Sequence, residues 1–235
     1  MKPLLTLLLA LTLGSGWAQT KSIKGAWKAT QPNNSTATMI VADNYLMIAS
    51  YNVMNKYFDR TQGGPFTIQG NTLTYTPEFN TADTAAVGVP IVYTVERIDS
   101  VLSFKGEEPL VWMIVDDAAN VDMAGTWHIT ERANDQGGMT KIHQQGTRKT
   151  LKILSKTRFQ WAAIDPAVKG FYGTGGGTYT VKDGKYTERI EFFSRDNNRV
   201  GANLSFNWAL KDGRWDHSGN SSTGSPIHEV WEKIK

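Results

Sequence analysis

A short phrase near the start of the chain recurs 100 residues later. The first copy reads Gly-Ala-Trp-Lys-Ala-Thr over residues 25–30, and the second reads Gly-Thr-Trp-His-Ile-Thr over residues 125–130. Residues 63–79 and 176–192 extend the match downstream. Because similarity at a fixed spacing is the sign of an internal duplication, any fold proposed for this chain must occur twice at about half its length.

The two predicted domains span residues 22–116 and 121–235, and a short polar stretch joins them. Residues 1–18 have the parts of a secretory signal: a basic Lys2, a short apolar core and small residues up to a cleavage point after Ala18. We therefore expect an exported protein, either periplasmic or secreted, with no transmembrane segment in the mature chain. The chain has no cysteine, which suits a bacterial envelope better than a disulfide-based extracellular module.

The charge is nearly balanced, with 25 Lys and Arg against 22 Asp and Glu, and the basic residues are scattered. Nucleic-acid binding is not expected, because no basic run or aromatic-basic stripe occurs. The eight tryptophans matter more than the charge, since they could fill or line a cavity.

Strand signals dominate both copies, because apolar and polar residues alternate over short stretches between turn residues. Predicted strands of the first copy cover 24–30, 36–41, 45–51, 65–68, 72–75, 91–98, 101–104 and 110–115. Those of the second copy cover 125–131, 149–154, 158–164, 178–181, 186–194, 202–211, 214–217 and 227–233. Asp183-Gly184 and Asp212-Gly213 predict two-residue hairpin turns. The expected fold is all-β, with two tandem small antiparallel up-and-down β-barrels of about eight strands each.

Gly-x-Trp at the start of a first strand, followed by about eight meandering strands, resembles the lipocalin and wider calycin pattern. More specifically, the chain is similar to secreted bacterial lipocalin-like domains of unknown function, here in tandem. The resemblance implies that Trp27 and Trp127 close the barrel floors, each under a basic residue from near the last strand. Lys233 or Lys235 would supply that residue in the second copy, whereas the first copy offers none. Each half is shorter than a typical lipocalin and lacks its long helix, so a fatty-acid-binding or avidin-like barrel is an equal geometric match.

Several kinds of chemistry find no support in the sequence. The histidines include no pair three or four residues apart, so neither a metal site nor a cofactor is expected. Without cysteine or a Gly-x-Ser-x-Gly elbow, nucleophilic hydrolysis is also not expected. The glycine run at residues 173–177 lacks the Lys-Ser/Thr ending of a phosphate loop, and we interpret it as a flexible turn.

The candidate ligand-binding residues all belong to the second copy. They are Arg158, Trp161, Tyr186, Glu188, Trp208 and His228. Alternation places Tyr186, Glu188 and Ile190 on one face of a strand. If that face points inward, Glu188 and Arg158 between aromatic walls would form a pocket for a polar-headed small molecule. The alternative is a solvated Glu188–Arg158 ion pair beside an ordinary aromatic core.

The same alternation would place Arg189, Glu191 and Phe193 together on the other face of that strand. Between the first two strands of the second copy, residues 133–146 form an insertion that is either a lid over the barrel or a surface loop.

The favoured function is an exported protein that holds a small hydrophobic or amphipathic ligand, mainly in the C-terminal barrel. One alternative is an enzyme on the same scaffold, an isomerase or hydrolase with Glu188 or His228 as acid or base. It predicts a raised carboxylate pKa beside an imidazole or arginine in one cleft. Another alternative is an envelope scaffold with filled barrels and an exposed aromatic patch.

Overall fold

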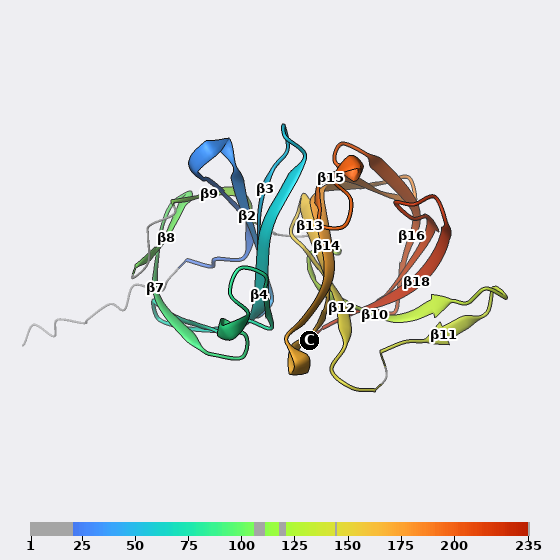
Figure 1. Cartoon of the computed structure of the whole chain (residues 1–235), viewed down its shortest axis with the longest axis horizontal. Helices are drawn as coiled ribbons and strands as arrows, with labels where there is room; N and C mark the ends of the chain where they lie inside the picture. The colour runs from blue at the N-terminus through green and yellow to red at the C-terminus, as the bar shows by residue number, and fades with distance from the viewer. Residues whose placement is uncertain (1–20, 106–110, 118–120, 144, 235) are drawn as a thin grey trace, which may run out of the picture.

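The computed structural model describes residues 21–105, 111–117, 121–143 and 145–234. Two antiparallel β-barrels lie side by side (Figure 1). The predicted signal segment, residues 1–18, lies outside the described residues, as does Lys235. Within the described part of the chain, none of the helical segments has the length and apolar character needed to cross a membrane.

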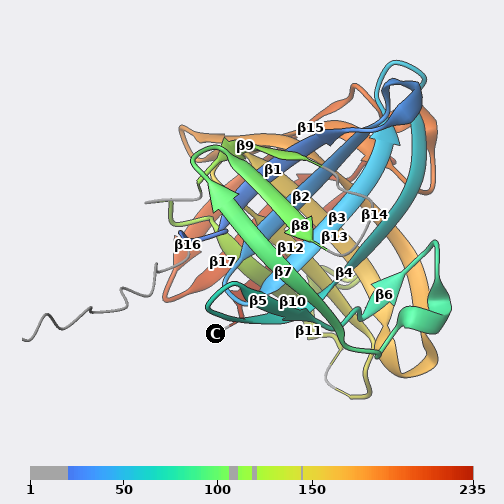
Figure 2. The same ribbon diagram turned by 90° about the vertical axis from the view of Figure 1, so that its left-hand side faces the viewer.

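The N-terminal barrel closes with eight strands, because β1 pairs with both β2 and β9 while β3 pairs with β4. Its tilted strands face the viewer in Figure 2. In chain order they are β1 (Gly25–Thr30), β2 (Thr36–Ala42), β3 (Tyr45–Asn52), β4 (Tyr57–Gln69), β5 (Thr72–Tyr75), β7 (Ile91–Ile98), β8 (Val101–Lys105) and β9 (Trp112–Asp116). A two-residue strand, β6 (Phe79–Asn80), pairs with β4 outside the ring. Single 3-10 turns lie at η1 (Pro32–Asn34) and η2 (Thr84–Ala86).

The C-terminal barrel repeats this plan, with β10 pairing with both β12 and β18. Its strands are β10 (Gly125–Ala133), β12 (Lys149–Leu154), β13 (Arg158–Asp165), β14 (Gly170–Lys182), β15 (Lys185–Phe193), β16 (Asn203–Lys211), β17 (Arg214–Asn220) and β18 (Pro226–Lys233). Turns of 3-10 helix occur at η3 (Pro166–Val168) and η4 (Asn197–Arg199). The prediction of two tandem eight-stranded barrels is therefore confirmed.

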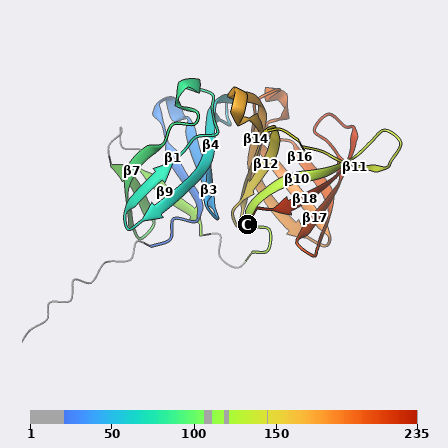
Figure 3. The same ribbon diagram turned by 90° about the horizontal axis from the view of Figure 1, so that it is seen from below.

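The insertion at residues 133–146 forms a hairpin in its described part. Its strand β11 (Met139–Lys141) pairs with the end of β10, and the hairpin projects from the barrel wall (Figures 1 and 3). The exposed β11 extends the sheet outward, whereas Ile142 and His143, which follow it in the insertion, line the interior of the barrel.

Glycines explain the largest differences from the predicted strands. The long strands β4 and β14 have 13 residues each, where the sequence indicated four. A Cβ on Gly63 would lie 2.6 Å from the Phe79 ring, and one on Gly176 would lie 2.5 Å from the Phe192 ring. Glycine is therefore needed inside these strands because an aromatic ring packs on the backbone. The interpretation of residues 173–177 as a turn was wrong.

Both predicted hairpin turns are present. The φ angles are 50° at Asp183 and 70° at Gly184, and 52° at Asp212 and 75° at Gly213. Positive φ at both central residues is the signature of a type I′ turn, which matches the twist of the strands it joins.

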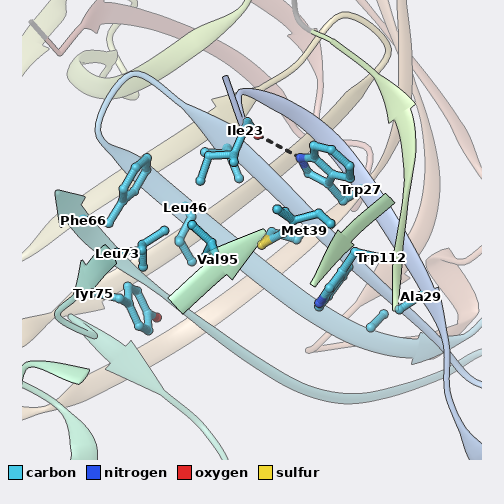
Figure 4. Packing of buried hydrophobic residues seen from close by; sticks show 13 residues of the cluster. Ile23, Trp27, Ala29, Met39, Leu46, Phe66, Leu73, Tyr75, Val95 and Trp112 are labelled. Carbon is cyan, nitrogen blue, oxygen red and sulfur yellow. Dashed lines mark hydrogen bonds between the residues drawn. The ribbon is translucent and has the colours of Figure 1, made fainter. Parts of the chain in front are cut away.

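The repeated Gly-x-Trp phrase forms the same unit in both barrels. The indole N–H of Trp27 donates to the Ile23 carbonyl at 2.8 Å (Figure 4). The Trp127 indole donates to the Met123 carbonyl at 2.9 Å. At Gly25, φ is 130° and a Cβ would lie 2.1 Å from the Asp116 carbonyl oxygen, so no other residue fits this position.

A basic group lies over each of these tryptophans. Lys233 Nζ lies 5.2 Å from the centre of the Trp127 ring, as the resemblance implied. The expectation that the first copy has no such partner was wrong, because the Arg97 guanidinium lies 5.0 Å from the Trp27 ring. The resemblance implied a basic residue near the last strand, whereas Arg97 comes from β7.

The barrels touch through the outer faces of β2 to β4 and of β12 to β15, which face each other in Figures 1 and 3. An apolar cluster spans this contact, formed by Ile40, Ala42, Tyr45, Met47 and Phe79 from one barrel and Leu151, Ile153, Ala162 and Ile164 from the other. Several strands here are buried on both faces, so polarity no longer alternates along them.

Polar groups complete the contact between the barrels. Arg158 donates to Glu191 at 2.8 Å, and the Tyr51 hydroxyl donates to the same carboxylate at 2.6 Å. Gln160 Nε2 donates to Thr61 Oγ1 at 2.8 Å. The two barrels are thus joined by matched hydrogen bonds as well as apolar packing.

Candidate functional site

The larger interior cavity belongs to the C-terminal barrel and measures about 580 Å³. That volume is within the range of small-molecule sites. Its wall is mixed: charged and polar side chains alternate with aromatic and aliphatic ones, among the latter Trp161, Ala163, Ile190, Phe193, Leu204, Phe206, Ile227 and Trp231.

A buried ion pair lies in the wall of this cavity. Lys152 Nζ on β12 is 2.9 Å from Glu188 Oε1 on β15, and each side chain is only 5% exposed. The ammonium also lies 5.0 Å from the Trp215 ring and 5.1 Å from the Trp231 ring. Hydrogen bonding and cation–π contacts thus offset the cost of removing the two charges from water.

A second cluster of polar side chains is centred on His217, a buried residue on β17. Its Nδ1 lies 3.4 Å from Glu229 Oε2, and Arg132 donates to the same carboxylate at 2.7 Å. Burial lowers the pKa of His217, and Lys152 lowers it further. Burial alone would raise the pKa of Glu229, but His217, Arg132 and Lys152 together lower it to about 2. At neutral pH the site therefore holds a neutral imidazole and an ionised carboxylate.

Because the pKa of Glu229 is lowered in the folded protein, the stabilisation that its carboxylate provides should be lost at acid pH. Glu229→Gln should lower the free energy of unfolding by roughly 3 kcal/mol at pH 7. The contribution of this carboxylate is complete above its unfolded pKa near 4.5 and is lost as the pH falls toward about 2. Urea denaturation between pH 7 and 3 should show the difference between wild type and variant shrinking below pH 4.5.

Glu232 provides the matched control on the same strand. It is 43% exposed and pairs with Arg214 at 3.5 Å, so Glu232→Gln should cost less than about 1 kcal/mol at every pH. Equal losses for the two variants would contradict the assigned role of Glu229.

Arginines gather at the solvent side of the cavity, where Arg132, Arg148 and Arg195 are exposed. The Arg148 guanidinium stacks 4.3 Å from the Tyr172 ring centre. Arg195 Nε donates to the Tyr172 carbonyl at 2.8 Å, and its guanidinium lies 5.6 Å from the Trp161 ring. Among the described residues, neither Arg148 nor Arg195 has a carboxylate partner.

The effect of this charge is visible at His143, which also lines the cavity. Burial lowers the pKa of His143, and Arg148 and Arg132 lower it further. The opening of the cavity is therefore a region of positive potential bordered by Trp161 and Phe193.

Two of the six predicted site residues, Trp161 and Glu188, line the cavity. Tyr186 shares the inward face with Glu188 but lies beneath the cavity, 5.0 Å from the Trp215 ring. Burial raises the pKa of Tyr186 and the nearby Glu188 raises it further, so the phenol stays protonated. Trp208 also points inward, and its indole lies 3.0 Å from Met123 Sδ outside the cavity lining.

The remaining two predicted residues lie elsewhere. Arg158 is on the outer face of β13 and pairs with Glu191 between the barrels, so Glu188 pairs with Lys152 instead. His228 is on the outer face of β18, 2.8 Å from Asp216. Glu188 and His228 therefore lie on opposite sides of the barrel wall and cannot share one cleft.

A β-bulge explains why simple alternation fails near the end of β15. The register against β14 shifts between Gly176 and Gly177. Glu191 and Phe192 therefore both reach the contact between the barrels, and Phe193 turns into the cavity. The expectation that Glu191 and Phe193 share a face was wrong, because a bulge adds one residue to the strand.

Sequence reasoning missed Lys152, His217 and the three arginines as site residues, and it noted Glu229 only beside His228. Lys152 lies between Leu151 and Ile153, and a lysine flanked on both sides by apolar residues was the available signal. The grouping of His217 with Glu229 and Arg132 depends on the pairing of β17, β18 and β10, which local sequence does not reveal.

Comparison with known proteins adds a family match for one half of the chain. Residues 122–235 match the family described as "Domain of unknown function (DUF4488)". A lipocalin-like protein of known structure from Bacteroides uniformis ATCC 8492 is similar over 48% of this chain and 100% of that one, at 15% sequence identity and a TM-score of 0.36. The comparison with curated proteins gave no match. By its own strand order, the chain is a tandem of two closed, eight-stranded antiparallel up-and-down barrels.

Proposed function

We propose that the C-terminal barrel binds a small amphipathic molecule with an anionic group, in a protein exported to the bacterial envelope. The observation that carries the proposal is the pair of unmatched guanidinium groups, Arg148 and Arg195, above a cavity of about 580 Å³. The carboxylates of the cavity are already occupied, Glu188 by Lys152 and Glu229 by Arg132. The excess positive charge is therefore available to a ligand.

The ligand would lie with its apolar body against Ile190, Leu204 and Ile227 and its anionic group at the arginine border. Arginine suits this role because its planar fork binds a carboxylate or phosphate through two hydrogen bonds. An exposed ion pair alone contributes little, so most of the affinity would come from apolar burial and the arginines would select the charge.

Dodecanoate and dodecanol provide a matched pair of probes, since they share a chain and differ in charge. Dodecanoate should bind the purified protein at least tenfold more tightly, measured by calorimetry and by quenching of tryptophan fluorescence. Arg148→Gln combined with Arg195→Gln should remove most of that difference and leave dodecanol binding unchanged.

Arg189→Gln is the control variant, because Arg189 is exposed on the outer face of β15. It should bind dodecanoate like the wild type. Equal affinity for the acid and the alcohol, or an equal loss of affinity in Arg189→Gln, would overturn the proposed anionic selectivity.

Export is tested separately by N-terminal sequencing of the protein from cell fractions. Cleavage after Ala18 would leave Gln19 as the first residue of periplasmic protein, and full-length protein retained in the cytoplasm would contradict that part of the proposal.

A further inference from the structure

We propose that the N-terminal barrel holds a second and separate binding site, for a small uncharged molecule of one or two rings that carries one hydrogen-bond acceptor. The site is the interior cavity of that barrel, and it differs from the C-terminal cavity in size and in charge.

The size of the N-terminal cavity limits what it can hold. It measures about 250 Å³, less than half the volume of the C-terminal cavity. An apolar protein cavity of roughly 150 Å³ is sufficient for benzene, so this one can hold a somewhat larger compact molecule. The apolar part of the lining includes Met39, Leu46, Ile48, Leu73, Phe104 and Trp112. Figure 4 shows Leu46, Leu73 and Trp112 within the barrel interior.

The charge of the lining excludes an ionised ligand. Among the described residues that line this cavity, Arg60 alone is charged, and it is 52% exposed and paired with Asp59 at 3.3 Å. Its other polar lining residues, such as Gln31, Ser50 and Asn80, are uncharged. A buried charge with no counter-charge is expensive in such surroundings, so a neutral molecule is favoured.

One buried group points to a hydrogen-bonded ligand. Tyr75 lines the cavity and is 3% exposed, and its hydroxyl has no hydrogen-bond partner among the residues that the structure describes. Burial raises the pKa of Tyr75, and Tyr93 and Glu78 raise it further, so the hydroxyl keeps its proton and can donate it. An unsatisfied buried hydroxyl is destabilising, and a ligand acceptor such as a hydroxyl, ether or carbonyl oxygen would relieve that cost.

The probes are 2-naphthol and naphthalene-2-carboxylate, which share a two-ring body and differ in charge at pH 7. We expect 2-naphthol to bind with one-to-one stoichiometry in calorimetry and to shift the Trp112 indole signal in NMR spectra. The carboxylate should leave that signal unmoved. Tyr75→Phe preserves the shape of the cavity and should weaken 2-naphthol binding about fivefold to tenfold, with unchanged binding of naphthalene.

Two further variants locate the site. Ala37→Leu adds bulk within the cavity and should abolish 2-naphthol binding with the melting temperature retained. The variant with both Arg148→Gln and Arg195→Gln should bind 2-naphthol like the wild type, which separates this site from the one in the C-terminal barrel. The inference would be overturned by absence of 2-naphthol binding, by unchanged affinity in both Tyr75→Phe and Ala37→Leu, or by equal binding of the carboxylate at the same site.

Discussion

Lys152→Met should lower the free energy of unfolding by about 3–5 kcal/mol, the largest loss that we expect from a single substitution in the C-terminal barrel. The variant leaves the Glu188 carboxylate buried without the ammonium that lies 2.9 Å from it. It also removes the cation from the group of aromatic rings formed by Phe159, Tyr186, Trp215 and Trp231. Urea denaturation followed by circular dichroism would measure the loss.

The double variant Lys152→Met with Glu188→Leu tests the reason for that loss. Because it removes both charges together, it should recover most of the stability. Lys105→Met is the matched control, since its pair with Glu96 is largely exposed and should contribute less than about 1 kcal/mol. If Lys152→Met lowered the free energy of unfolding by less than about 1 kcal/mol, water in the cavity would have to solvate Glu188, and the ion pair would not be shielded from solvent.

The second large effect concerns the contact between the barrels. Arg158→Met should cost about 2–4 kcal/mol, because Glu191 and the Tyr51 hydroxyl would remain buried without the guanidinium. We also expect the wild type to unfold in a single transition and Arg158→Met to unfold in two. Differential scanning calorimetry would resolve the two transitions, and Arg189→Met on the exposed face of β15 should leave a single transition near the wild-type temperature.

The pH dependence of this effect has a defined sign. Burial alone would raise the pKa of Glu191, but the hydrogen bonds from Arg158 lower it below its ordinary value. The stabilisation is therefore complete above pH 4.5 and declines as the pH falls below it. The difference between wild type and Arg158→Met should narrow in the same range, and a difference independent of pH would contradict the pairing of Arg158 with Glu191.

The strands could be predicted from the sequence because local signals define them. Asp183-Gly184 and Asp212-Gly213 identified their turns through glycine. Alternation placed Tyr186 and Glu188 on one face of a strand but did not show that this face points inward. The failures occurred where tertiary contacts decide the outcome. Gly63 and Gly176 resemble turn residues until Phe79 and Phe192 are seen to pack on them.

Arg158 shows the same limit for the candidate site. Its neighbours Phe159 and Trp161 point into the barrel, so alternation places Arg158 outside. It is nevertheless buried, because a second barrel covers that face. A single strand does not reveal that its outer side is covered, and so Lys152, which lies among apolar neighbours, was overlooked as the partner of Glu188.

The contact between the barrels has a consequence for how far the two halves can differ. It joins overlapping but unequal walls: β12 contacts β2, its counterpart in the other barrel, whereas β15, the fifth barrel strand of its half, contacts β3 and β4. Two identical chains related by a two-fold axis would use the same strands on both sides, so the contact matches such a dimer only at β2 and β12. Because the two halves belong to one chain, they need not use the same surface or remain identical in sequence. One interior could then acquire charge while the other stayed neutral.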